Sequence, residues 1–143
     1  MNYLLDTCVL SELRKPAPNP GLVDWARQAH EPGLYLSVLS IGEIQRGIAR
    51  LDDGRRKQAL QHWLEHDLLA RFADRILAVE LDAALEWGLV GAARERAGHP
   101  APVTDSLIAA TAIVHNLVLV TRNQKDFRGY PVKVLNPWNA AIG

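Results

Sequence analysis

The sequence lacks several features that would assign a protein to a special class. It has one cysteine, Cys8, in 143 residues, so an intrachain disulfide is excluded, which fits a reducing compartment. No apolar run reaches the roughly 18 residues of a membrane span, and the start does not resemble a signal peptide. Sixteen basic residues balance 16 acidic ones, so no net charge attracts nucleic acid over a distance. We therefore expect a cytoplasmic protein that does not enter a membrane, with any surface for nucleic acid confined to a local patch.

What the sequence does contain is the composition and pattern of one folded α/β domain. Hydrophobic residues make up 48% and charged residues 22%, close to the average of folded proteins, so we treat residues 1–143 as a single domain. Short apolar runs predict strands at 3–5, 34–40, 75–81, 117–121 and 132–135. Helical spacing and helix-start residues predict helices at 6–13, 21–29, 41–51, 56–72, 81–97 and 102–116. Apolar strands that alternate with helices predict a mostly parallel central sheet flanked by helices, in three layers of the α/β/α type.

Asp6 is a charged residue inside the otherwise apolar stretch YLLDTCVL. A carboxylate in such surroundings costs several kcal/mol unless something compensates it. Ligands of parallel sheets bind outside the carboxyl ends of the strands, and Asp6 ends the first predicted strand. Glu43 comes shortly after the strand at 34–40, and Thr121 and Asn123 follow the apolar run LVLV. We expect these residues to meet at one rim of the sheet.

Each of three acids also has a purely structural interpretation, which stays open. Asp6 is suited to cap the helix that follows it. Ser40 and Glu43 have the spacing of a capping box, and Asp105 lies in the first turn of a helix, where the macrodipole favours an acid. Several carboxylates at one rim, however, would repel one another unless a cation binds. Oxygen ligands suit Mg²⁺ or Mn²⁺, and Mg²⁺ commonly completes its shell with water and phosphate oxygens, which predicts a phosphodiester substrate.

The opening segment YLLDTCVLSEL resembles the segment LLDTNVLSEL of PIN-domain ribonucleases, in particular the VapC and FitB toxins of bacterial toxin–antitoxin pairs. Four further segments resemble the family in the same order: LSVLSIGEIQRGI with Glu43, GHPAPVTDSLIAATA with Asp105, LVLVTRNQKDF, and VLNPW. The resemblance covers essentially the whole chain. It implies a PIN-like domain whose active-site acids are Asp6, Glu43 and Asp105.

Two positions depart from the family's pattern. Asn123 aligns with a position that often carries a fourth acid, which leaves the binding of a second metal ion open. Asp126, three residues further on, is a candidate to replace that acid. Cys8 stands where the family commonly has Asn, and we expect a neutral thiol neither to bind Mg²⁺ nor to orient a water well.

The resemblance implies a toxin that hydrolyses RNA with Mg²⁺, or with Mn²⁺ in its place. Asp6 and Asp105 would hold the metal ion, and Glu43 would bind it directly or through a water, or act as general base. The hydroxyl groups of Thr7 and Thr121 could support these carboxylates, although both residues could equally be ordinary turn and strand-end residues.

Three arginines are candidates for binding the RNA backbone: Arg46, Arg50 and Arg122. Arg46 and Arg50 follow Glu43 on the same face of the predicted helix. Solvated helix charge explains them equally well. A chain without net charge needs some such local patch to bind RNA, or a basic partner that helps.

The family pairs each toxin with a small antitoxin, here expected to be of the VapB or FitA kind. The antitoxin binds operator DNA, so we expect this chain to meet DNA only indirectly. The family also implies a homodimer. Trp63, Phe72 and Trp87 on the helices at 56–72 and 81–97 suit an interface, although core packing explains them equally well.

Three other functions compete with this one. The segment HWLEH fits the pattern of inverted zinc peptidases through His62, Glu65 and His66, but helical spacing puts both histidines on the solvent side. A phosphatase with Asp6 as nucleophile is disfavoured, because Cys8 stands where that pattern needs a second Asp. A degenerate PIN domain that only binds RNA or an antitoxin stays open, given the departures above.

Overall fold

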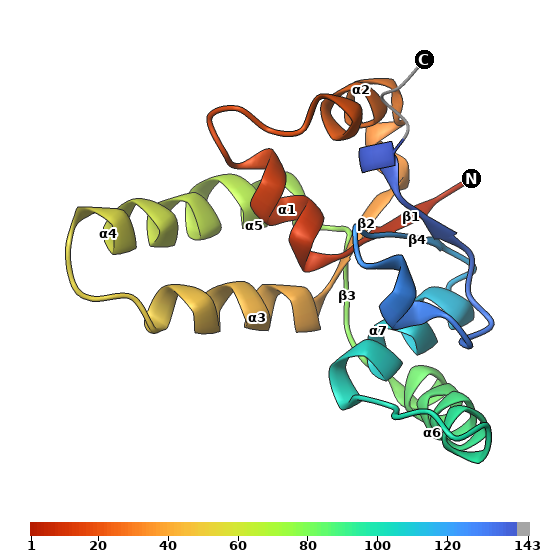
Figure 1. Cartoon of the computed structure of the whole chain (residues 1–143). Coiled ribbons are helices and arrows are strands. Elements are labelled where there is room, and N and C mark those ends of the chain that lie inside the picture. Colours follow the sequence, from red (N-terminus) through yellow and green to blue (C-terminus); the bar gives the residue numbers. More distant parts are fainter. Residues whose placement is uncertain (140–143) are drawn as a thin grey trace.

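Five short parallel strands form the centre of the structure, a computed structural model that describes residues 1–139 (Figure 1). The strands are β1 (Tyr3–Leu5), β2 (Leu34–Ser37), β3 (Ile76–Leu77), β4 (Val118–Val120) and β5 (Val134–Leu135). Their order is β3-β2-β1-β4-β5, and every neighbouring pair is parallel. Leu4 of β1 pairs with Tyr35 of β2 on one side and with Leu119 of β4 on the other. The predicted parallel sheet is therefore confirmed, with the strand that precedes Asp6 at its centre.

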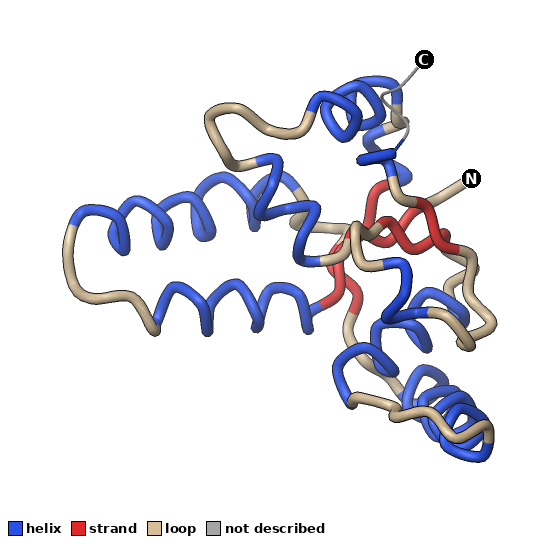
Figure 2. The backbone as a smooth tube through the Cα atoms, viewed as in Figure 1, coloured by secondary structure: helices blue, strands red, loops and turns tan. Residues whose placement is uncertain are grey.

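Helices cover both faces of the sheet, as Figure 2 shows. The longer ones are α1 (Thr7–Leu13), α2 (Pro20–Gln28), α3 (Val38–Ala49), α4 (Arg55–His62), α6 (Leu81–Arg96) and α7 (Val103–Val114). The shorter ones are η1 (Glu31–Gly33), η2 (Trp63–Leu68), α5 (Leu69–Arg71), η3 (Gln124–Phe127) and η4 (Pro137–Asn139). Within residues 1–139, none of them combines the length and the apolar character that a bilayer span demands.

Alternating residues of the central strands separate two hydrophobic clusters, one on each face of the sheet. Leu5 and Val120 belong to the cluster under α1, α2 and α3. Leu4 and Leu119 belong to the cluster under α6 and α7. All four side chains are at most 1% exposed. The predicted three-layer α/β/α arrangement is therefore the observed one.

Helices α3 and α4 run side by side as a hairpin that extends away from the sheet (Figure 1). Gln45 of α3 and Gln61 of α4 exchange two side-chain hydrogen bonds of 2.8 and 3.0 Å across this hairpin. The predicted helix at 56–72 is one continuous helical segment, but its middle, Trp63–Leu68, is a π-helix that the apolar spacing did not reveal.

Four predicted strands are longer than the observed ones, those at 34–40, 75–81, 117–121 and 132–135, and the first two differ most. The strand expected at 34–40 ends at Ser37, whose hydroxyl accepts a hydrogen bond from the N–H of Leu39 and caps α3. The predicted capping box of Ser40 and Glu43 is therefore wrong, because both residues lie inside α3. The strand expected at 75–81 is only the edge strand β3, which pairs with β2 alone.

The aromatic residues proposed for an interface have different surroundings. Phe72 is completely buried in the core, so its assignment to an interface is wrong. Trp63 is half-buried and packs against the same core cluster. Trp87 of α6 is 38% exposed and remains available to a partner.

Candidate functional site

Asp6 lies at the junction of β1 and α1 and is only 9% exposed. Its Oδ1 accepts a 2.9 Å hydrogen bond from the N–H of Thr7, which makes it the N-cap of α1. Its Oδ2 accepts a 2.8 Å hydrogen bond from the hydroxyl of Thr121, which follows β4 and is fully buried. The structural interpretation of Asp6 as a cap is confirmed. It leaves the carboxylate at the carboxyl ends of two adjacent strands, where a ligand would bind.

The half-buried thiol of Cys8 lies beside this pair. Its Sγ is 3.9 Å from Oδ2 of Asp6 and 3.5 Å from the hydroxyl of Thr121. It also accepts a hydrogen bond of 3.5 Å from the N–H of Arg122. Burial raises the pKa of the Cys8 thiol above its ordinary value, which favours the protonated form. Cys8 therefore contacts both sides of the junction between α1 and the end of β4.

Glu43 reaches the same rim from α3. Its Oε1 accepts a 2.9 Å hydrogen bond from the hydroxyl of Thr7. Thr7 thus holds two acids, Asp6 through its backbone N–H and Glu43 through its side chain. The Glu43 side chain is otherwise exposed, so it is free to meet water and substrate.

Asp105 lies in the first turn of α7 and is half-buried. Burial raises its pKa above the ordinary value, and the charges of Asp126, Asp6 and Glu43 raise it further, in that order. The charge of Arg94 has the opposite effect on this pKa. Three acids from other segments are therefore close enough to repel the Asp105 carboxylate.

Burial likewise raises the pKa of Asp6, and the charge of Asp126 raises it a little more. Hydrogen bonds from Thr121, Thr7 and Cys8 lower the pKa and favour the charged form. The net shift is upward, so the local donors offset the cost of burying the Asp6 carboxylate only in part.

Asp126 brings the fourth carboxylate to this cluster, and Asn123 does not. Asn123 precedes η3, and its N–H donates to the hydroxyl of Thr121 at 3.0 Å. Asp126 is exposed on η3, and its charge acts on both Asp6 and Asp105. Asp126 is the residue that the sequence named as a candidate to replace the fourth acid, and the short helix η3 is what brings position 126 to the rim.

The donor set of this rim fits a hard divalent cation. All four candidate ligands are carboxylates, and their mutual repulsion is what a bound cation would relieve. Among residues 1–139, no three His, Cys, Asp or Glu side chains already converge as a complete chelating group. Mg²⁺ commonly takes one or two protein carboxylates and keeps several waters.

The segment 62–66 does not offer a comparable site. His62 and His66 have ring centres 4.4 Å apart and tilted planes, and both side chains are exposed, as is Glu65. A catalytic zinc ion needs three protein ligands, and the described part of the chain supplies no such trio here.

The predicted arginines are all exposed. Arg46 and Arg50 follow Glu43 along α3, and the guanidinium of Arg122 lies 6.0 Å from the ring of Trp138. The structure adds two arginines that the sequence did not single out. Arg14 and Arg56 line a groove of about 230 Å³ that also contains Thr7 and Glu43, between α1 and the α3–α4 hairpin.

A larger cavity of about 690 Å³ lies at the opposite, amino-terminal ends of the strands. Its lining includes Asn2, His115 and Lys133 but no carboxylate. The acidic rim is therefore the better candidate on chemical grounds, although it is the less hollow of the two.

Comparison with known proteins agrees with this picture. The PIN domain family model matches residues 3–133. The chain is 33% identical to VapC ribonuclease Y4jK of Sinorhizobium fredii over 138 residues, which covers 96% of this chain and 99% of that protein. It is 35% identical to toxin FitB of Neisseria gonorrhoeae over 136 residues, which covers 95% and 98%. The solved structure of FitAB bound to an IR36 DNA fragment superposes with a TM-score of 0.89 at 34% identity, covering 95% of each chain.

Proposed function

The chain belongs to the PIN-domain family, and on this premise we propose that it is the toxin of a toxin–antitoxin pair and cleaves RNA with a bound divalent metal ion. The observation that carries the proposal is the acidic rim. The negative charges of Asp6, Glu43 and Asp126 raise the pKa of Asp105, and the charge of Asp126 also raises the pKa of Asp6. A bound cation would relieve this repulsion. The similarity to a VapC ribonuclease over nearly the whole chain supports RNA as the substrate.

In this proposal Asp6 and Asp105 hold Mg²⁺, or Mn²⁺ in its place. When bound, the ion supplies positive charge for the phosphate group and acidifies water. Thr121 and Thr7 fix the orientation of the Asp6 carboxylate through their hydrogen bonds. Glu43, exposed and held by the Thr7 hydroxyl, takes the proton of the attacking water.

Exposed arginines would bind the RNA backbone around this rim. Arg46 and Arg50 extend from Glu43 along α3, and Arg122 lies at the end of β4. Arg14 and Arg56 in the adjoining groove add positive charge next to Glu43. Because the whole chain carries no net charge, this local patch is what attracts phosphates.

An antitoxin of the VapB or FitA kind is the proposed protein partner. Two similar solved structures are FitAB bound to an IR36 DNA fragment and FitAcB from Neisseria gonorrhoeae. Such a partner would bring DNA to the assembly, so this chain itself needs no surface for a duplex.

A second copy of the chain is the proposed partner of α6. Leu81, Leu85 and Leu89 recur every four residues on this helix and are 74%, 62% and 67% exposed. A parallel row of small residues accompanies them: Ala84, Gly88 and Ala92. A leucine ridge beside a row of small residues suits close packing of two helices. The exposed Trp87 lies on the same helix.

The test is cleavage of a labelled single-stranded RNA with Mg²⁺ by the wild type, Asp105→Asn and His62→Ala. We expect Asp105→Asn to lower the cleavage rate by roughly 100-fold or more. The substitution removes a charge that would hold the metal ion, and each loss of about 1.4 kcal/mol in transition-state stabilisation slows the reaction tenfold. His62→Ala should cleave like the wild type. Equal cleavage by Asp105→Asn would overturn the active site. Binding of RNA without cleavage by the wild type would favour the degenerate, binding-only function.

A further inference from the structure

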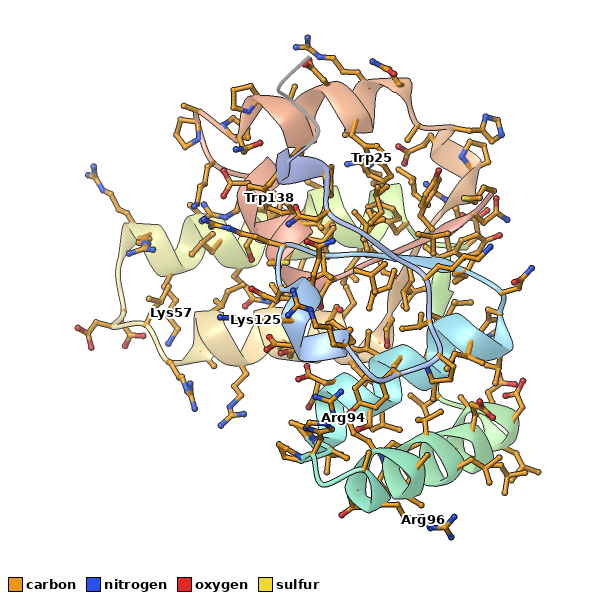
Figure 3. The ribbon with its side chains drawn as sticks, turned by 45° about the vertical axis from the view of Figure 1, so that its right-hand side comes forward. Trp25, Lys57, Arg94, Arg96, Lys125 and Trp138 are labelled. Carbon is orange, nitrogen blue, oxygen red and sulfur yellow. The ribbon has the colours of Figure 1, made fainter. Side chains whose placement is uncertain are left out.

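Three segments of the chain meet at the guanidinium group of Arg94. Arg94 lies in the last turn of α6 and is half-buried. Its Nε donates a 2.6 Å hydrogen bond to the carbonyl of Pro100, and its Nη1 donates to the carbonyl of Arg128. Its Cζ lies 4.5 Å from the ring centre of Tyr130. Figure 3 shows Arg94 directed toward these segments, whereas Arg96, two residues on, points away from the molecule.

The first of these contacts fixes the start of α7, which carries Asp105. No side chain caps this helix, because its N-cap residue is Pro102. The hydrogen bond from Arg94 to the carbonyl of Pro100 instead anchors the chain two residues before this N-cap. A second anchor acts from the other side, where the hydroxyl groups of Ser106 and Tyr130 are 2.6 Å apart in a buried hydrogen bond.

The other contact fixes the segment that follows Asp126. Arg128, whose carbonyl accepts from Arg94, is two residues beyond this acid. Gly129 has a φ of +91°, which strains any other residue, and a Cβ there would be 3.3 Å from Nη1 of Arg94. The chain thus passes close to the guanidinium at a position that requires glycine.

We propose that Arg94 is a positioning residue that sets the distance between Asp105 and Asp126, so that both face the same metal ion. The inference rests on the metal-dependent function proposed above. Arg94 forms no hydrogen bond or ion pair with either acid among the described residues. Its charge lowers the pKa of Asp105, whereas the positioning role proposed here depends on its contacts with Pro100, Arg128 and Tyr130. The guanidinium is planar and directs its donors at fixed angles, so it can bind two carbonyls while its face lies against a ring. An ammonium group has three donors but neither a planar face nor a fixed fork.

The experiment measures Mn²⁺ affinity of the full chain by the electron paramagnetic resonance of free Mn²⁺, at a temperature where circular dichroism shows each variant folded. Arg94→Lys keeps the charge and removes the fork. Arg96→Lys is the matched control, since the Arg96 side chain is exposed and makes no hydrogen bond or ion pair within residues 1–139. We expect Arg94→Lys to bind Mn²⁺ roughly tenfold more weakly, as for other residues that orient metal ligands, and Arg96→Lys to match the wild type.

A second variant tests the other anchor. Tyr130→Phe keeps the ring under Arg94 and removes only the hydroxyl that meets Ser106, so it should weaken Mn²⁺ binding as well, by a smaller factor. Wild-type affinity in both Arg94→Lys and Tyr130→Phe would overturn the positioning role and leave the proposed function intact. Failure of the wild type to bind Mn²⁺ would overturn the metal site itself, and the positioning role with it.

Discussion

At the scale of single residues, Asp6 uses one carboxylate oxygen for the fold and the other for the site. Oδ1 caps α1 through the N–H of Thr7, while Oδ2 accepts from Thr121 at the rim. Asparagine is as good a helix cap as aspartate but carries no charge. Replacing Asp6 by asparagine therefore keeps the helix cap and removes only the charge.

We therefore expect Asp6→Asn to stay folded, with a free energy of unfolding within about 1 kcal/mol of the wild type, because the cap acceptor is kept. RNA cleavage should fall by roughly 100-fold or more, because the charge that holds the metal ion is lost. Denaturant unfolding and an initial-rate cleavage assay on the same preparation check both halves. A variant that cleaves normally would contradict the assignment of Asp6.

Cys8, two residues after Asp6, can be replaced by the same residue, asparagine, for comparison with Asp6→Asn. Its Sγ accepts from the N–H of Arg122 and lies near Asp6 and Thr121. An asparagine amide has both an acceptor and a donor for these neighbours. We expect Cys8→Asn to retain or raise the cleavage rate in the same assay. A large loss would mean that the thiol has a task of its own.

The residues of the rim could be predicted only in part. Asp6 and Thr121 follow apolar strands, so their meeting at one edge was accessible from the pattern of the sequence. The shared spacing of Ser40 and Glu43 was misleading, because Ser37 caps the helix earlier. Arg94 could not be found, since its partners belong to loops that come together only in the folded chain.

At the scale of elements, Arg75 and Glu31 fasten the edge of the sheet. Arg75 donates to the carbonyls of Glu31 and Leu34 at 2.6 and 2.8 Å, just before β3. Glu31 accepts hydrogen bonds from Arg71 and from Arg75. The hydrogen bond from Arg71 is the main cause that lowers the pKa of Glu31 below its ordinary value, and Arg75 adds to it.

The ion pairs of Glu31 with Arg71 and Arg75, here called the clamp, predict a free energy of unfolding that depends on pH. A lowered pKa contributes stability above the unfolded value of about 4.5 and loses it as pH falls through the folded value. We expect Glu31→Gln to lower the free energy of unfolding by roughly 1 kcal/mol at pH 7. The effect is small because solvent screens the ion pairs of the partly exposed Glu31 side chain. The difference from the wild type should be smaller at pH 3 than at pH 7, because protonation of Glu31 removes the contribution of its charge. Urea unfolding at both pH values measures it.

Glu80→Gln is the control for this series, because the exposed Glu80 side chain has no hydrogen bond or ion pair within residues 1–139. It should match the wild type at both pH values. A Glu31→Gln difference that persisted unchanged at pH 3 would show that the clamp does not depend on the charge of Glu31.

The extent of the elements was harder to predict than their existence. The apolar run at 34–40 contains both a strand and the first turn of α3, and only the hydroxyl of Ser37 marks the boundary. The strand β3 lies at the edge of the sheet and pairs only with β2. The pattern of apolar residues does not indicate which strands lie at an edge. The long helices α6 and α7 were accessible because their helical pattern spans many residues.

At the scale of the whole molecule, the exposed leucines of α6 predict self-association. Leu85 is 62% exposed, so Leu85→Asp should leave the fold unchanged and place a charge at the centre of the proposed interface. We expect the wild type to sediment as a dimer at micromolar concentration and Leu85→Asp as a monomer. Ala59→Asp, on an exposed position of α4, is the control and should remain dimeric. A monomeric wild type, with and without antitoxin, would contradict the dimer.

The central claim is that the acidic rim cleaves RNA only with a divalent cation. The most direct measurement is cleavage of a labelled single-stranded RNA by the wild type after removal of metal with EDTA, followed by titration with Mg²⁺, beside an identically purified Asp6→Asn sample. The account predicts no cleavage in EDTA, recovery that saturates with Mg²⁺, and no recovery in Asp6→Asn. Cleavage that persists in EDTA, or that recovers equally in Asp6→Asn, would contradict it.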